Sequence, residues 1–344
     1  MKPIHSILNS IVEPIEKVKK DYDNTNSRRL IEVMGKYVFG VDIGGTTAKI
    51  GLLTEEGEKV ELWEIPTRKE NNGSSILSDV AESVKAKIAE KNLVSGDIIG
   101  IGLGVPGAVD ADGMCLQAVN LGWSKLNVVK ELESLTGFKV KAGNDANVAA
   151  LGEQWRGGGQ GHQNMLLVTL GTGVGGGIIN EGKILTGATG SGGEIGHIHL
   201  VDDEPEACGC GNHGCFEQYA SATGAVRVSK RILAETTEDS VLRGKDFECK
   251  DVFDAAKKGD KVAVKCAEKY GYYLGKGIAI ASTVVNPEII VIGGGVSKAG
   301  EMLFDLLMPS FKKYVFSGCS TAQFALAKLG NDAGVFGAAR MLLY

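Results

Sequence analysis

Residues 37–46 read YVFGVDIGGT, an apolar run that ends in an aspartate and a glycine-rich turn. The run from Tyr37 to Asp42 predicts a buried strand, and residues 43–46 predict a tight turn. A second strand follows from Thr47 to Leu53, and a third from Lys59 to Ile65. With a helix over residues 75–91 and a buried strand over 98–105, this half of the chain is predicted to be a mixed α/β unit.

The same pattern recurs further along the chain. A strand is predicted over residues 164–170, a glycine-threonine turn over 171–177 and a short strand at 178–179. Because strand, turn and strand occur twice, we expect two lobes built on one plan, with a ligand between them that contacts both turns. A helix over residues 261–285, a strand over 288–292 and a last helix over 333–344 complete the second half. The last helix has small residues on one face and is expected to pack back onto the first lobe near the hinge.

Composition excludes several classes of protein. The chain has 344 residues, too many for one typical core, and its formal net charge is -5 without long basic runs, which argues against a nucleic-acid surface. No apolar run approaches the roughly 20 residues that cross a membrane, and no signal peptide is recognisable. Residues 1–36 show helical apolar spacing and predict an amphipathic extension that packs on the body or on a neighbouring subunit. Clustered cysteines are typical of metal binding in a reducing compartment, so we expect a cytoplasmic protein.

The two glycine-threonine turns suit nucleotide phosphates. Such turns present backbone N–H groups and hydroxyls without side-chain bulk. Asp42, at the start of the first turn, is a candidate for holding Mg²⁺ through its water shell, although either turn alone is equally well read as an ordinary tight turn. The sequence contains neither a GxxxxGK[ST] motif nor a strand-linked dinucleotide motif.

Asp145 is the candidate catalytic base. It lies in residues 141–147, KAGNDAN, after a short strand predicted over 138–140 and before a helix predicted to run through Trp155. Phosphoryl transfer needs a carboxylate within hydrogen-bond reach of the attacking hydroxyl. The alternative is that Asp145 only caps the following helix, which its position alone favours.

Residues 197–215 contain the most specific local signal. His197, Cys208, Cys210 and Cys215 would complete a Cys₃His shell, which is typical of a structural zinc site. His199 and His213 compete with His197 for the nitrogen position. Glu194 and Glu217 flank this segment and are suited to hydrogen bonds with sugar hydroxyls if the metal holds the loop in place. Taken singly, either glutamate is more often a solvated surface charge.

Taken together, these motifs resemble the ROK family of bacterial repressors and sugar kinases, within the larger group of actin-like ATPases. The resemblance runs from about residue 38 to the end of the chain. It rests on six segments in order: residues 42–46, DIGGT; 104–107, GVPG; 143–147, GNDAN; 170–175, LGTGVG; 193–197, GEIGH; and 208–217, CGCGNHGCFE.

The resemblance implies an α/β, two-lobed actin-like ATPase fold of the ribonuclease H-like type, with the active site in a cleft between the lobes. We expect a helical extension at 1–36, a small lobe at 37–143 joined by the helix at 333–344, and a large lobe at 144–332 that carries a zinc-binding loop at 197–215. The resemblance further implies that Asp145 is the catalytic base. The implied sugar-binding residues are Gly107, Asn120, Asn144, Asp145, Glu194, His197 and Glu217. The implied nucleotide-binding residues are Asp42, Gly44, Gly45, Thr46, Thr47, Gly171, Thr172, Gly173, Gly293, Gly294 and Gly295. The implied zinc ligands are His197, Cys208, Cys210 and Cys215, with His197 using its second nitrogen for a sugar hydroxyl.

The resemblance implies ATP-dependent phosphorylation of a hexose at its 6-hydroxyl, and glucose is the expected substrate. The implied cofactors are ATP, Mg²⁺ and structural Zn²⁺. N-acetylmannosamine, N-acetylglucosamine and fructose kinases share nearly all of these residues. A sugar-sensing regulator without turnover is the alternative of a different class. Repressors of the family carry an N-terminal winged helix-turn-helix, for which residues 1–36 are too short. A homodimer or higher homo-oligomer is expected, with no nucleic-acid or membrane partner.

Overall fold

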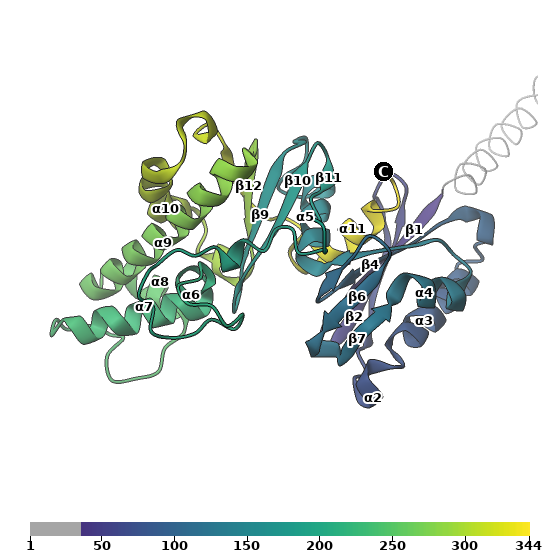
Figure 1. Ribbon diagram of the computed structural model, residues 1–344, viewed down its shortest axis with the longest axis horizontal. Coiled ribbons are helices and arrows are strands. Elements are labelled where there is room, and N and C mark those ends of the chain that lie inside the picture. The colour runs from purple at the N-terminus through teal and green to yellow at the C-terminus, as the bar shows by residue number, and fades with distance from the viewer. Residues whose placement is uncertain (1–35) are drawn as a thin grey trace, which may run out of the picture.

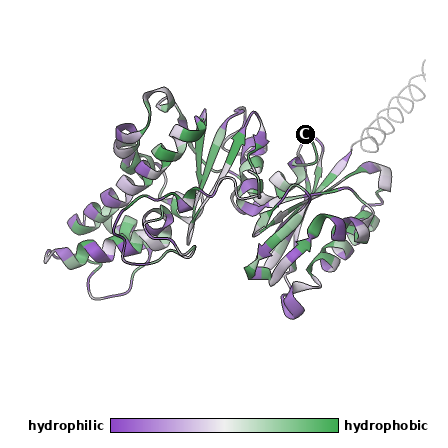
Figure 2. Ribbon diagram, in the orientation of Figure 1, coloured by the Kyte–Doolittle hydropathy of each residue, from purple (hydrophilic) through white to green (hydrophobic). Residues whose placement is uncertain are grey.

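The computed structural model describes residues 36–344 as two α/β lobes that meet at two helices, α5 (Asp145–Arg156) and α11 (Ala333–Arg340) (Figure 1). The predicted N-terminal helix lies outside the described residues, apart from Lys36. Each lobe is built around its own five-stranded sheet. The central strands of the sheets are mostly apolar, as Figure 2 shows, which is expected where helices cover both faces of a sheet.

The first sheet has the strand order β3-β2-β1-β4-β8. Strands β1 (Tyr37–Ile43), β2 (Thr47–Thr54) and β3 (Lys59–Pro66) form the predicted antiparallel meander. Strands β4 (Ile98–Val105) and β8 (Val140–Asn144) continue the sheet in parallel with β1. The carboxyl ends of β1, β4 and β8 therefore lie at one edge, where α/β proteins commonly bind ligands.

A small second layer in the first lobe was not predicted. Strands β5 (Ala108–Val109), β6 (Met114–Ala118) and β7 (Trp123–Asn127) form a three-stranded antiparallel sheet. Helices α2 (Glu70–Gly73), α3 (Ile76–Glu90) and α4 (Val128–Thr136) complete the lobe. Its core includes Phe39, Ile50, Leu103, Leu121 and Leu132, each at most 1% exposed.

The second sheet repeats the plan of the first. Its order is β11-β10-β9-β12-β13, from β9 (Met165–Leu170), β10 (Val174–Asn180), β11 (Lys183–Ile184), β12 (Ile289–Gly293) and β13 (Gln323–Leu326). Strands β9 to β11 form an antiparallel meander, and β12 and β13 run parallel to β9. The repeat of one topology confirms the prediction of two lobes on one plan.

Three predicted boundaries are wrong. The second turn covers only residues 171–173, because the glycines at 175–177 belong to β10. These glycines serve close packing: a Cβ on Gly177 would lie 2.4 Å from the Cβ of Ala150 in α5. The strand before Asp145 is β8 at Val140–Asn144 rather than 138–140, and the last helix ends at Arg340 rather than at residue 344.

Helices form the outer part of the second lobe. They are α6 (Glu217–Ala220), α7 (Ala222–Glu235), α8 (Cys249–Lys257), α9 (Lys261–Val285) and α10 (Glu301–Tyr314). They share one core with the sheet, in which Phe216, Tyr270 and Phe311 are at most 1% exposed. None of the helices in residues 36–344 combines the length and apolar character that a bilayer crossing requires.

Helix α11 packs against the first sheet and against α5 at backbone distance, as predicted for the last helix. A Cβ on Gly102 of β4 would lie 1.8 Å from the carbonyl oxygen of Ala338, and a Cβ on Gly337 would lie 1.7 Å from the carbonyl oxygen of Val148. Only glycine permits contacts this close. The junction between the lobes is thus a tight crossing of α11 over α5.

Candidate active site

Asp145 stands at the first position of helix α5, directly after β8. The N-cap is Asn144, whose side-chain oxygen accepts hydrogen bonds from the backbone N–H groups of Ala146 (3.0 Å) and Asn147 (3.2 Å). The capping alternative for Asp145 is therefore wrong. One oxygen of Asp145 accepts the N–H of Ala146 at 2.8 Å.

The carboxylate of Asp145 lies near two others. Burial raises its pKa, and the charge of Glu194 raises it further. Burial raises the pKa of Asp42 to about 6, and repulsion from Asp145 adds to this effect while Lys49 opposes it. The structure thus brings together Asp42 from the first lobe with Asp145 and Glu194 from the second. Asp42 and Asp145 are half-buried and Glu194 is exposed. Crowded carboxylates with raised pKa values are typical of functional sites and favour a bound cation.

The first turn, between β1 and β2, is open. The N–H of Gly44 donates to the carbonyl of Thr47 at 2.9 Å, and the hydroxyl of Thr67 donates to the carbonyl of Gly44 at 2.8 Å. Nothing lies within 4 Å of where a Cβ on Gly45 would be, and Thr46 and Thr47 are exposed. A phosphate can therefore approach this backbone without displacing a side chain.

The second turn, between β9 and β10, is tied to helix α7. The N–H of Ala222 donates to the carbonyl of Gly171 at 2.8 Å, and the hydroxyl of Thr223 donates to the carbonyl of Thr172 at 3.0 Å. A Cβ on Gly173 would lie 2.5 Å from a carboxylate oxygen of Glu217. The turn is consequently held between α7 and Glu217, which also lies close to the cysteine cluster.

Four predicted metal ligands converge. One ligand atom from each of His197, Cys208, Cys210 and Cys215 lies within 4.8 Å of all the others. The Sγ atoms of Cys210 and Cys215 are 3.7 Å apart, and Nδ1 of His197 is 3.8 Å from Sγ of Cys208. Tetrahedral zinc with bonds of about 2.3 Å to sulfur places two thiolates about 3.8 Å apart. The donor set and its spacing therefore fit Zn²⁺.

The two competing histidines are engaged elsewhere. His199 contacts Asp202 through Nε2 at 2.9 Å and the carbonyl of His213 through Nδ1 at 3.0 Å. His213 contacts the carbonyl of Glu204 through Nδ1 at 2.8 Å. Because Nδ1 of His197 faces the thiols, its Nε2 is the nitrogen left for another partner.

Most of the predicted sugar-binding residues are connected by short contacts. The Nδ2 of Asn144 donates to the carbonyl of Gly107 at 3.4 Å. The Oε1 of Glu217 lies 3.9 Å from Nδ1 of His197 and accepts a hydrogen bond from Cys208 at 2.9 Å. Asn120 differs, since it is exposed on the turn Val119–Leu121 and none of the contacts described for residues 36–344 joins it to this group.

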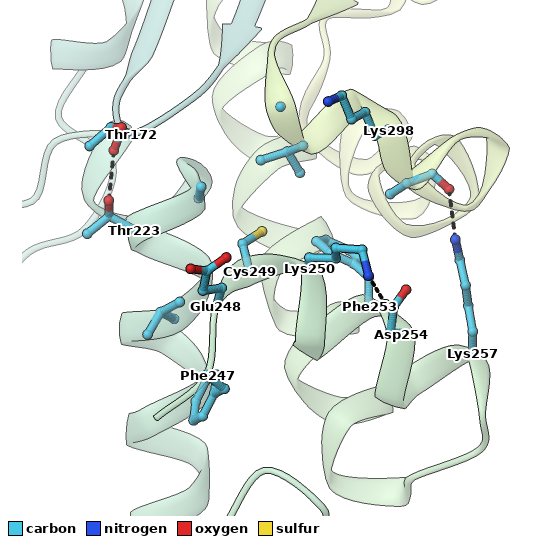
Figure 3. Close-up of a pocket in the computed structure, with 15 residues that line it drawn as sticks. Thr172, Thr223, Phe247, Glu248, Cys249, Lys250, Phe253, Asp254, Lys257 and Lys298 are labelled. Carbon is cyan, nitrogen blue, oxygen red and sulfur yellow. Dashed lines mark hydrogen bonds and ion pairs between the residues drawn. The ribbon is translucent and has the colours of Figure 1, made fainter. Parts of the chain in front are cut away.

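A cavity of about 610 Å³ beside the second turn was not predicted as a whole (Figure 3). It lies between α7, α8 and the segment Gly295–Ala299, and of the predicted nucleotide residues Thr172 and Gly295 line it. Its apolar lining includes Val226, Phe253 and Val296, and Lys250, Lys257 and Lys298 also line it. Gly294 does not line the cavity, because it packs on the end of β9, where a Cβ would lie 2.4 Å from the carbonyl oxygen of Leu170. Gly293 ends β12. The helical residues were missed because neither α7 nor α8 contains a recognisable motif.

Comparison with known proteins matches residues 38–343 to the ROK family. A glucokinase of Halalkalibacterium halodurans is 44% identical over 308 residues, covering 88% of this chain and 93% of the relative. A solved ROK family glucokinase from Streptomyces griseus, in complex with glucose and AMPPNP, is 35% identical with a TM-score of 0.67, covering 89% of this chain and 98% of that one. A solved ROK family transcriptional regulator, a homologue of E. coli MLC, is 28% identical with a TM-score of 0.78, and the match covers 91% of this chain and 79% of that one.

Proposed function

Because the chain belongs to the ROK family, we propose that it is a kinase that transfers phosphate from ATP to the 6-hydroxyl of a hexose, with glucose as the substrate. The observation that carries the proposal is the placement of Asp145, a half-buried carboxylate beside Glu194 and Asp42 at the junction of the lobes. The names of the relatives support a hexose kinase. The predicted fold class and family are confirmed.

In the proposed reaction Asp145 accepts the proton of the attacking hydroxyl, since a half-buried carboxylate with a raised pKa is suited to general-base catalysis. Asn144, Glu194, His197 and Glu217 orient the sugar by hydrogen bonds to its hydroxyls. The turns at residues 44–47 and 171–173 donate backbone N–H groups to the phosphates of ATP. The adenosine would occupy the 610 Å³ cavity, whose apolar lining suits a planar base.

Two metal ions complete the proposal. Mg²⁺ neutralises phosphate charge when bound, and Asp42 is the residue that would hold it. Zn²⁺ would be held by His197, Cys208, Cys210 and Cys215, and a closed shell of four protein ligands has a structural role. Its role here is to fix the loop that carries His197 and precedes Glu217.

An assay of ADP release over a panel of sugars tests the activity. Glucose is expected to give the highest kcat/KM among glucose, fructose, N-acetylglucosamine and N-acetylmannosamine, and a different preferred sugar would reassign the substrate. Failure of every sugar to support turnover would refute the kinase. In that case calorimetry that shows sugar binding without nucleotide binding would establish the sensor, an alternative that the regulator among the structural relatives favours.

The cavity has its own test. Ala222 lines it at the start of α7, so Ala222→Phe is expected to raise the KM for ATP at least tenfold while the KM for the hexose changes less than twofold. An unchanged KM for ATP in a folded variant would move the adenosine elsewhere.

Several predictions are retained as part of the proposal. They are the lobe limits at 37–143 and 144–332, a cytoplasmic location, and a homodimer or higher homo-oligomer. Light scattering of the full chain and of a chain that begins at Lys36 would measure the oligomer and the contribution of the extension to it.

A further inference from the structure

The predicted zinc ion would hold the two ends of its loop but not the stretch between His197 and Cys208. That stretch is attached to the helical part of the lobe by other contacts. Leu200 is buried, and its carbonyl accepts a hydrogen bond from Nζ of Lys276 in α9 at 3.0 Å. A second attachment lies four residues further on, at Glu204.

The buried Glu204 forms an ion pair with Arg231 of helix α7, whose side chain is 37% exposed. The side chain of Glu204 is 0% exposed, and its two oxygens accept hydrogen bonds from Arg231 at 2.7 and 2.8 Å. The hydroxyl of Tyr219, in α6, donates to the same carboxylate. The hydrogen bonds from Arg231 lower the pKa of Glu204 to about 2, so the carboxylate stays charged at neutral pH. A buried charge of this kind persists only where its partners are fixed.

The same short helix connects this ion pair to the candidate sugar site. Three successive residues of α6 face three different partners. Glu217 contacts His197 and Cys208, the oxygen of Gln218 accepts the N–H of Cys215 at 3.0 Å, and Tyr219 contacts Glu204. Because α6 is the single turn Glu217–Ala220, we expect a shift of Tyr219 to move Glu217 with it.

We propose that Glu204, Arg231 and Tyr219 form a clamp, a second and metal-independent anchor of the zinc loop, whose role is to position Glu217 for the hexose. These are positioning residues, since none of them lies among the residues proposed to touch substrate. The proposal rests on the proposed kinase function. It gives a reason for the buried charge of Glu204, which neither the predicted zinc shell nor the phosphate turns explain.

Glu204→Gln and Tyr219→Phe test the clamp with small changes of shape. Glu204→Gln is expected to raise the KM for the hexose at least fivefold, and Tyr219→Phe at least twofold, with zinc still at one per chain. The KM for ATP should rise by a smaller factor, because Glu217 also contacts the second turn at Gly173 and Val174. Because the residues act through one clamp, the double variant should match Glu204→Gln rather than show the product of both effects. The matched control is Glu238→Gln, which breaks an exposed pair with Lys265 (2.6 Å) in the same lobe and should change neither KM.

Hydrogen–deuterium exchange gives a readout that is independent of turnover. Backbone amides in residues 198–221 should exchange faster in Glu204→Gln than in the wild type, with those of α10 unchanged. The clamp would be overturned if the exchange were unchanged or if the hexose KM were unchanged in the folded single variants. It would also be overturned if both KM values rose equally or if zinc were lost. A wild-type chain that phosphorylates no sugar would overturn the kinase instead, and the exchange measurement would still decide whether the clamp holds the loop.

Discussion

Replacing Asp145 by asparagine separates catalysis from helix capping. The helix N-terminus is satisfied by Asn144, so Asp145→Asn leaves the cap in place and keeps the size of the side chain. The free energy of unfolding should change by no more than about 0.5 kcal/mol, the usual range for changes away from stabilising features. At neutral pH this change should be a rise, because the substitution removes repulsion between Asp145 and the carboxylates of Asp42 and Glu194.

The effect on the rate should be large. A positioned general base contributes about 10²- to 10⁴-fold, so kcat should fall by that factor, which corresponds to about 3–5 kcal/mol of activation free energy. The KM for the hexose should change by less than about tenfold, since proton transfer belongs to the transition state. A coupled ADP assay at saturating substrates measures kcat, and chemical denaturation measures stability on the same samples.

Asp260 provides the matched control, because it is an aspartate that does cap a helix. Its Oδ1 accepts the N–H groups of Val262 (3.0 Å) and Ala263 (2.9 Å) at the start of α9. Asp260→Ala should cost about 1 kcal/mol of stability and leave kcat unchanged. If Asp145→Asn kept more than a tenth of the wild-type kcat, or lost as much stability as Asp260→Ala, the assignment of Asp145 as the base would be refuted.

The remaining predictions concern pH, zinc and the hinge. The kcat/KM should fall as the pH drops through about 6, because Asp42 becomes protonated there rather than near 3.8, and a pH profile that stays flat down to pH 4.5 would contradict this. Because the pKa of Asp42 is raised in the folded state, its ionisation destabilises the folded protein as the pH rises from about 4 to about 6. Asp42→Asn should therefore be more stable than the wild type at pH 7, and thermal melts should show this difference vanishing as the pH is lowered from about 6 to about 4. Cys210→Ser should reduce zinc content, stability and hexose affinity together, with the zinc content measured by mass spectrometry. Full retention of zinc would exclude Cys210 as a ligand. Gly337→Ala should lower the free energy of unfolding by at least about 2 kcal/mol, because the added Cβ would lie 1.7 Å from the carbonyl oxygen of Val148 in α5. Gly96→Ala is the control, since nothing lies within 4 Å of its added Cβ, and denaturant titrations should show almost no change in its stability.

The sequence predicted the features that depend on local pattern. The meander at residues 37–65 follows from alternating apolar runs and turns. The Cys₃His group was predicted from spacing, and the structure brings its four ligand atoms together. The glycines at 175–177 were misplaced because a glycine in a turn and a glycine under a packed helix look the same in a sequence. Only the position of α5 against β10 distinguishes the two.

The parts that were missed depend on contacts between distant segments. The three-stranded sheet β5-β6-β7 consists of short strands in which buried, half-buried and exposed positions do not alternate regularly. The cavity near Phe253 is formed by α7, α8 and residues 295–299, which only the tertiary fold brings together. The ion pair of Glu204 and Arg231 joins residues 27 positions apart that belong to no motif.

The contact of α11 with the first sheet has a consequence for biosynthesis. Residues 333–340 leave the ribosome after the whole second lobe, yet they cover β1 and β4. Until then one apolar face of the nascent first sheet has no partner, and transiently exposed apolar surface of this kind promotes aggregation. Early termination of translation anywhere before residue 333 should therefore release a chain that needs a chaperone, even when every residue of the proposed active site has been made.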